Sequence, residues 1–87
     1  MRMNGKLYKG TIIINEETVE VSDSNGSYQD RLEKCLVEIC LLLAIEVPLW
    51  LSKNTREYVA FRRTSFNADQ FFNKINFERF EIRILEG

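Results

Sequence analysis

The sequence predicts an α+β fold: a β-hairpin, one long helix packed on the sheet, a short helix and a C-terminal strand. Three observations support this class. Residues 3–22 alternate between apolar and polar side chains and are rich in β-branched residues. Apolar residues recur at helical spacing from Tyr28 to Leu43, and strict alternation returns in FERFEIRILE at 77–86. A sheet whose apolar face is covered by helices from outside the hairpin is an α+β arrangement.

The length and composition predict a single α+β domain spanning residues 1–87. A second core in a chain of 87 residues would leave too little apolar surface for either core. The hydrophobic fraction of 45% and the charged fraction of 29% are typical of a globular protein. One proline and four glycines give no flexible linker.

The first twenty residues predict two strands joined by a tight turn. Gly10 favours a turn at Lys9-Gly10, whereas Asn15-Glu16-Glu17 is the alternative because it breaks the alternation. We place the hairpin at Lys9-Gly10 and a bulge or kink near Asn15. Val19 and Val21 then face the core, whereas Glu20 and Ser22 face water.

The long helix is predicted to begin after a turn at Asn25-Gly26. Ser27 and Asp30 have the spacing of a capping box, and the helix should run to about Ala44. Its predicted buried stripe consists of Tyr28, Leu32, Cys35, Leu36, Ile39 and Leu43.

The C-terminal half of this helix carries more apolar residues than one stripe needs. Val37, Leu41 and Leu42 widen the apolar surface in the last turns. Either segment 47–61 covers them, which we favour, or they contact a partner. Val37 and Leu41 are therefore candidate interface residues.

Segment 47–76 is harder to assign. Val47-Pro48 should end the helix, and Trp50 is expected to fill the core. Residues 57–63 fit a short strand with Val59 and Phe61 inward, and a helix continuing from Ser52 fits nearly as well. Asn67 with Gln70 predicts the N-terminus of a short helix that carries Phe71 and Phe72.

The last segment predicts a strand with one buried face. Phe80, Ile82 and Ile84 alternate with Arg79, Glu81 and Arg83. The predicted core comprises Leu7, Val19, Val21, Leu32, Leu36, Ile39, Leu43, Trp50, Phe61, Phe71, Phe80, Ile82 and Ile84. The element order is similar to the ubiquitin-like β-grasp, in which the last strand lies beside the first, and this likeness implies no function.

Charge is unevenly distributed along a nearly neutral chain. The net charge is −1, but residues 1–51 hold 5 basic and 8 acidic groups while residues 52–87 hold 7 basic and 5 acidic groups. The basic and aromatic segment 53–66 supplies candidate contacts for a partner or an anion: Lys53, Arg56, Tyr58, Arg62 and Arg63. The near-zero net charge makes nucleic acid an unfavoured ligand.

Chemistry-bearing residues are few. The chain has two cysteines and no histidine, so we expect no metal, no cofactor and no catalytic residue. The only polar cluster that could be imagined as catalytic places Glu57 and Asp69 near Thr64 and Ser65, and turn or capping hydrogen bonds are their more ordinary role. Buried free thiols fit a reducing cytoplasm, and no apolar run is long enough to span a membrane.

The second half of the chain also carries a resemblance. Residues PLWL at 48–51, Asn54, RE at 56–57, Phe61, TSF at 64–66, DQF at 69–71 and FERFEI at 77–82 are similar to a group of small uncharacterised bacterial proteins, mostly from anaerobic Gram-positive species. The likeness covers the whole chain and implies a free-standing protein. It implies no activity, ligand or partner.

These observations favour a small non-enzymatic protein-interaction or adaptor module that self-associates or binds another protein. The alternative is weak nucleic-acid or anionic-ligand binding through segment 53–66.

Overall fold

The computed structural model describes residues 1–22 and 26–86. Within them a four-stranded sheet is formed by β1 (Arg2–Lys9), β2 (Ile12–Glu20), β3 (Arg63–Asn67) and β4 (Arg79–Glu86). Two α-helices, α1 (Tyr28–Leu43) and α2 (Ser52–Phe61), and a 3-10 turn, η1 (Ala68–Gln70), complete the described chain. The predicted α+β class is confirmed.

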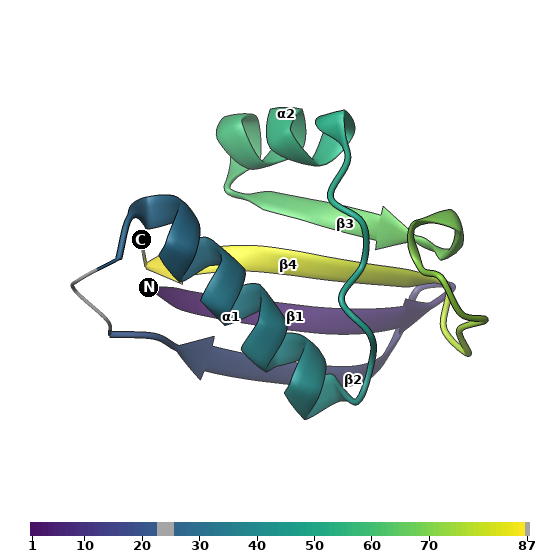
Figure 1. Cartoon of the computed structure of the whole chain (residues 1–87). Helices are drawn as coiled ribbons and strands as arrows, with labels where there is room; N and C mark the ends of the chain where they lie inside the picture. Colours follow the sequence, from purple (N-terminus) through teal and green to yellow (C-terminus); the bar gives the residue numbers. More distant parts are fainter. Residues whose placement is uncertain (23–25, 87) are drawn as a thin grey trace.

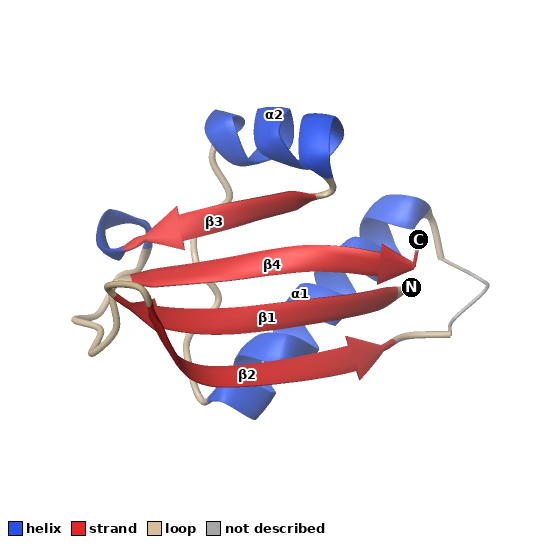
Figure 2. Ribbon diagram, turned by 180° about the vertical axis from the view of Figure 1, so that it is seen from behind, coloured by secondary structure: helices blue, strands red, loops and turns tan. Residues whose placement is uncertain are grey.

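The strands lie in the order β2-β1-β4-β3, and every neighbouring pair is antiparallel. The last strand does lie beside the first, as Figures 1 and 2 show, but a β-grasp-like fold is not confirmed. Residues 52–61 form a second helix, so the helix alternative for this segment is confirmed. The short strand at 57–63 and the prediction of one long helix are wrong.

The N-terminal hairpin forms where the glycine predicts it. Gly10 has φ +62°, a conformation that residues with a Cβ rarely adopt. The register shifts between Leu7, which faces Asn15, and Tyr8, which faces Ile13. Ile14 is therefore the extra residue of the predicted bulge. Val19 and Val21 are buried and Glu20 and Ser22 are exposed, as expected.

Helix α1 begins at the predicted capping box and ends one turn before Pro48. The Ser27 hydroxyl accepts a hydrogen bond from the Asp30 N–H, and the Asp30 carboxylate accepts one from the Ser27 N–H. The proposed turn at Asn25-Gly26 includes Asn25, which lies outside the described residues. Ala44 in the left-handed conformation ends the helix, so Val47-Pro48 is not the terminator.

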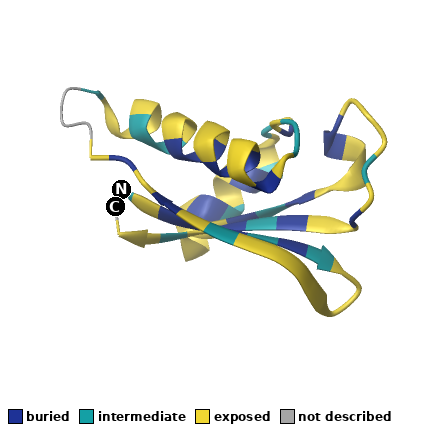
Figure 3. Ribbon diagram, turned by 90° about the horizontal axis from the view of Figure 1, so that it is seen from below, coloured by how far each residue is buried: buried dark blue, intermediate teal, exposed yellow. Residues whose placement is uncertain are grey.

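Helix α1 lies across one face of the sheet, over β1 and β2 (Figures 1 and 3). Gly5 of β1 permits this approach, since a Cβ there would lie 2.9 Å from the Ile39 Cδ1. Seen from behind, the opposite face of the sheet carries no helix (Figure 2). The core therefore lies on one side of the sheet, under α1 and the segment that connects it to α2.

The observed core matches most of the prediction. Buried apolar residues are Met3, Leu7, Val19, Val21, Cys35, Leu36, Ile39, Cys40, Leu43, Tyr58, Phe66, Phe71, Phe77, Phe80 and Ile82. Leu32, Trp50 and Ile84 are half-buried against them. The prediction that Phe61 belongs to the core is wrong, because this residue is at the end of α2 with 64% of its surface exposed. Tyr28, which was predicted in the buried stripe of the helix, is also exposed.

The connection from α1 to α2 runs across the helix-bearing face of the sheet (Figure 1). It is fixed to η1 by two hydrogen bonds, from the Leu49 N–H to the Gln70 carbonyl (2.8 Å) and from the Gln70 side-chain amide to the Leu49 carbonyl (2.9 Å). Trp50 packs its ring against Tyr58 and Phe66, with centroids 5.9 and 5.8 Å away. The predicted short helix is thus a single 3-10 turn, with Phe71 buried and Phe72 exposed.

Candidate interaction sites

The structure does not bring the five basic and aromatic candidates into one exposed site. Arg56, Arg62 and Arg63 are exposed and Lys53 is half-buried, but Tyr58 is buried. The Tyr58 hydroxyl is hydrogen-bonded to the Tyr28 hydroxyl, and burial raises the pKa of Tyr58. Tyr58 is therefore a packing residue, and no base or ring of a ligand can stack on it.

The aromatic ring that is exposed in this region is that of Phe61 and not that of Tyr58. The Arg63 guanidinium carbon lies 5.7 Å from the centre of the exposed Phe61 ring. Arg63 also faces Arg83 directly in the β3–β4 register. The neighbouring pair, Thr64 and Ile82, is buried, so Arg63 and Arg83 lie on the opposite face of the sheet. Like charges directly opposite each other are unfavourable, and a bound anion would relieve the repulsion. Neither Phe61 nor Arg83 was predicted from the sequence as a site residue.

A polar network under α2 joins this helix to the edge of β3. The Asn54 side-chain amide donates to the Thr64 hydroxyl (2.7 Å) and to the Ser65 carbonyl (2.9 Å). Its side-chain oxygen accepts from the Leu51 N–H and from the Gln70 amide, each at 2.9 Å. Among the described residues, no buried side-chain polar atom lacks a partner. The network is a structural element that seats α2.

The polar cluster considered for catalysis is part of the same network. The Thr64 hydroxyl donates to the Glu57 carboxylate, and Thr64 is buried. Asp69 is exposed in η1, and within the described residues no hydrogen bond joins it to Thr64 or Ser65. The hydrogen bond between Thr64 and Glu57 therefore has a structural role, which is to hold α2 against β3.

The outer face of α1 is the second candidate surface. Segment 47–61 does not cover it: Val37, Leu41 and Leu42 are all exposed, and Leu41 is 72% exposed. The prediction that this chain's own segment covers them is therefore wrong. Segment 47–61 instead contacts the other flank of α1, where Leu36 and Leu32 line a groove with Pro48 and Trp50.

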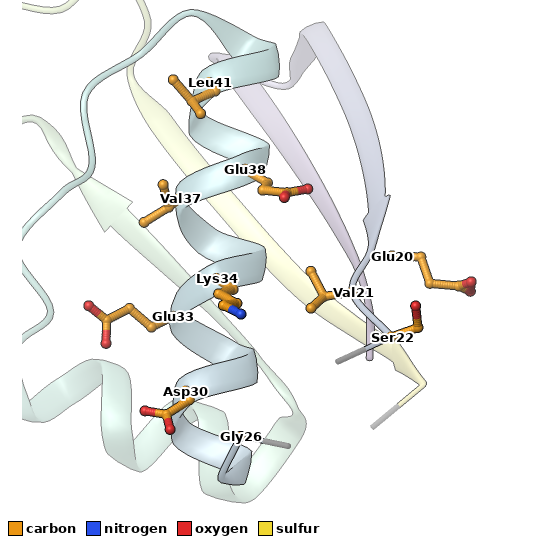
Figure 4. Close-up of a pocket in the computed structure, with 10 residues that line it drawn as sticks. All are labelled: Glu20, Val21, Ser22, Gly26, Asp30, Glu33, Lys34, Val37, Glu38 and Leu41. Atoms are coloured by element: carbon orange, nitrogen blue, oxygen red, sulfur yellow. The ribbon is translucent and has the colours of Figure 1, made fainter. Parts of the chain in front are cut away.

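A shallow depression of about 900 Å³ lies along α1 and the end of β2 (Figure 4). Val21, Val37 and Leu41 are its apolar members. Four carboxylates and one ammonium group surround them: Glu20, Asp30, Glu33, Glu38 and Lys34. The depression thus combines three apolar side chains with four carboxylates.

The outer edge of β2 is the third exposed feature. β2 lies at the end of the strand order, so no described strand pairs with that edge. Ile12, Ile13 and Ile14 are exposed there, and Ile12 is 68% exposed. An unpaired edge with apolar side chains is a template for another strand.

The two thiols are free and buried. Burial raises the pKa of Cys40 to about 12, and burial also raises the pKa of Cys35. The described residues contain no group of three or more histidine, cysteine, aspartate or glutamate side chains placed to hold a metal ion. No described helix has the length and apolar character needed to cross a bilayer.

Comparison with known proteins finds no matching family, no similar curated protein and no similar solved structure. The resemblance to small uncharacterised bacterial proteins stays a prediction. The exposed surfaces described above are therefore the basis of the proposed function.

Proposed function

We propose that this protein is a small non-enzymatic interaction or adaptor module of the cytoplasm, which docks a basic amphipathic segment of a partner chain, either another protein or a second copy of itself. The docking surface is the outer face of α1 with the adjoining end of β2. The observation that carries the proposal is the exposure of Leu41 and Val37 inside a depression with four carboxylates.

Both parts of this surface favour association. Leucine and valine side chains that become buried contribute about 1.5–3 kcal/mol each when they are fully removed from water. The carboxylates of Asp30, Glu33 and Glu38 lie around them and favour a positively charged partner. An apolar centre within a polar rim is the usual anatomy of a protein interface.

The chemistry of the remaining residues supports a binding role rather than a reaction. A chain without histidine needs a thiolate, lysine or carboxylate for nucleophilic or acid–base chemistry. Both thiols are buried with raised pKa values, so they are neutral at pH 7. The same buried, reduced thiols support a cytoplasmic location.

Selection from a displayed library of helical peptides tests the proposal. We expect enriched peptides to combine lysine or arginine with leucine-type residues, and Leu41→Lys to weaken their binding at least tenfold. Phe72→Lys is the matched control, because Phe72 is 82% exposed on another surface. Failure to enrich any peptide, or enriched peptides that bind Leu41→Lys and the wild type equally, would contradict the proposal.

Weak anion or nucleic-acid binding is the second candidate, favoured by the Arg63–Arg83 pair beside the exposed Phe61 ring. Retention on heparin at about 0.1 M salt tests it, because counterion release makes such binding salt-dependent. We expect Arg63→Glu to abolish retention and Lys74→Glu, an equal charge change on another surface, to preserve it. Flow-through of the wild-type protein would exclude this candidate.

A further inference from the structure

The structure places a basic helix and an acidic depression on opposite edges of one sheet. α2 lies beside β3 at one edge, whereas the depression lies between α1 and β2 at the other (Figure 1). Figure 4 shows Asp30, Glu33 and Glu38 along α1 and Glu20 at the end of β2, with Leu41 at one end of the depression. The two surfaces have opposite charge, and each carries exposed apolar side chains.

The outward face of α2 has the properties of the basic segment that the depression should bind. Asn54 and Tyr58 are buried, so helical spacing turns Arg56, Val59 and Ala60 outward. Val59 is 70% exposed, and Lys53 lies at the flank of the same face. Arg62, which caps the C-terminus of α2, is also exposed. Neither Arg56 nor Arg62 forms an ion pair with another described residue.

We propose that the partner is a second copy of this chain, whose α2 docks into the depression between α1 and β2. This inference rests on the proposed function, because it uses the same surface and names its occupant. Val59 of one copy would contact Val37 and Leu41 of the next. Arg56 and Lys53 would lie against the acidic rim. Charge complementarity and the two exposed apolar faces select this occupant.

The position of the two surfaces decides the form of the assembly. Because they lie at opposite edges, a single molecule cannot bring its own α2 to its own depression. Each contact joins unlike surfaces, so the copies associate head to tail and every added copy leaves one free α2 and one free depression. Rim ion pairs are individually weak and screened by salt. The association should therefore be concentration-dependent and should fall as salt is raised from 0.05 to about 0.5 M.

Charge reversals at the two surfaces give a sharp test. Glu38→Lys damages the depression and leaves α2 intact, whereas Arg56→Glu damages α2 and leaves the depression intact. Both residues are exposed, so the variants should fold, and circular dichroism with thermal melting checks this. Lys74→Glu is the matched control, since it changes the net charge by the same amount as Arg56→Glu at an exposed site in another segment.

Sedimentation velocity at low salt supplies the readout. We expect the mean mass of the wild type and of Lys74→Glu to rise with concentration, and each of the other variants to stay monomeric. An equimolar mixture of Glu38→Lys and Arg56→Glu should associate again, because the intact α2 of Glu38→Lys meets the intact depression of Arg56→Glu.

Three outcomes would overturn the inference. A wild-type protein that stays monomeric to millimolar concentration excludes self-association, yet peptide binding to the Leu41 surface would leave the proposed function standing. Association that survives both charge reversals, or reversals that abolish it without recovery in the mixture, excludes the head-to-tail contact. The peptide selection is done at nanomolar protein, so its failure is read separately from self-association.

Discussion

The two edges of the sheet are treated differently. At the β3 edge, α2 folds back and the Asn54 amide bonds the Ser65 carbonyl, so a backbone group that would face solvent has a partner inside the molecule. At the β2 edge no described strand or helix covers the backbone, and three isoleucines are exposed. One edge is closed by a helix, and the other is left open.

The hydrogen bonds of a single residue, Asn54, hold α2 over the β3 edge of the sheet. One asparagine supplies two donors and one doubly used acceptor, and it joins α2, β3 and η1. The open edge has weaker protection: a bulge at Ile14 interrupts its regular pairing, and Glu16, Glu17 and Glu20 add charge. Bulges and charges reduce unwanted strand pairing without preventing it.

The largest effect should come from the core that supports both edges. Leu36 is 6% exposed on the inner side of α1, so Leu36→Ala should lower the free energy of unfolding by about 2–5 kcal/mol through lost burial and the cavity left behind. Leu41→Ala on the outer side of the same helix should cost less than about 0.5 kcal/mol. Urea unfolding measures both, and equal losses would show that the inner and outer faces are wrongly assigned.

The second-largest loss of stability is expected at the β3 edge, which α2 covers. Asn54→Ala leaves the Ser65 carbonyl, the Gln70 amide and the Leu51 N–H without their partner, so it should cost about 2–3 kcal/mol or more. Hydrogen exchange should show faster exchange in α2 while α1 stays protected. Asn76→Ala at an exposed position is the control. An Asn54→Ala protein as stable as this control would mean that the network does not hold α2.

The sequence was sufficient for elements whose pattern fits one period only. The hairpin, α1 and the final strand were predicted because their apolar spacing excludes the alternative. Segment 52–61 was not, since Tyr58, Val59 and Phe61 suit a strand as well as a helix. Contacts with Thr64, Gln70 and Tyr28, which lie up to 30 residues away, select the helix. Tertiary contacts of this kind leave no local signal.

The candidate site residues also differ in how well the sequence predicts them. Val37 and Leu41 were identified as apolar residues in excess of the one stripe that a surface helix buries. The favoured prediction that segment 47–61 covers them is wrong, since both are exposed, and the alternative that they contact a partner stays a prediction. Tyr58 was misassigned because its exposure depends on which secondary structure its segment adopts. Arg83 was missed because only the strand register places it opposite Arg63, twenty positions earlier.

A smaller effect on stability tests whether water reaches the core in the folded protein. Burial raises the pKa of the Cys40 thiol from its ordinary value of 9.0 to about 12. Above pH 9 the unfolded chain releases this proton and the folded chain retains it, so stability should fall as pH rises, by on the order of 1 kcal/mol between pH 9 and 10.

Cys40→Ala should decline less steeply with pH than the wild type, although its stability at pH 7 is lower. Tyr58 and Cys35, whose pKa values burial also raises, keep part of the slope in both proteins. Urea unfolding at pH 8, 9 and 10 gives the slopes. Parallel slopes would mean that the Cys40 thiol is reached by water in the folded state.

The smallest effect on stability is expected at the open edge. Ile13 is exposed and faces Tyr8 across the hairpin, so Ile13→Lys should change the free energy of unfolding by less than about 0.5 kcal/mol. A charge on a free edge opposes strand addition, so the variant should aggregate more slowly on heating, as followed by light scattering. Lys74→Ile, which adds an isoleucine away from β2, should not protect against aggregation. If Ile13→Lys aggregates as fast as the wild type, the edge is closed in solution or aggregation starts elsewhere, and the contrast between the two edges loses its physical consequence.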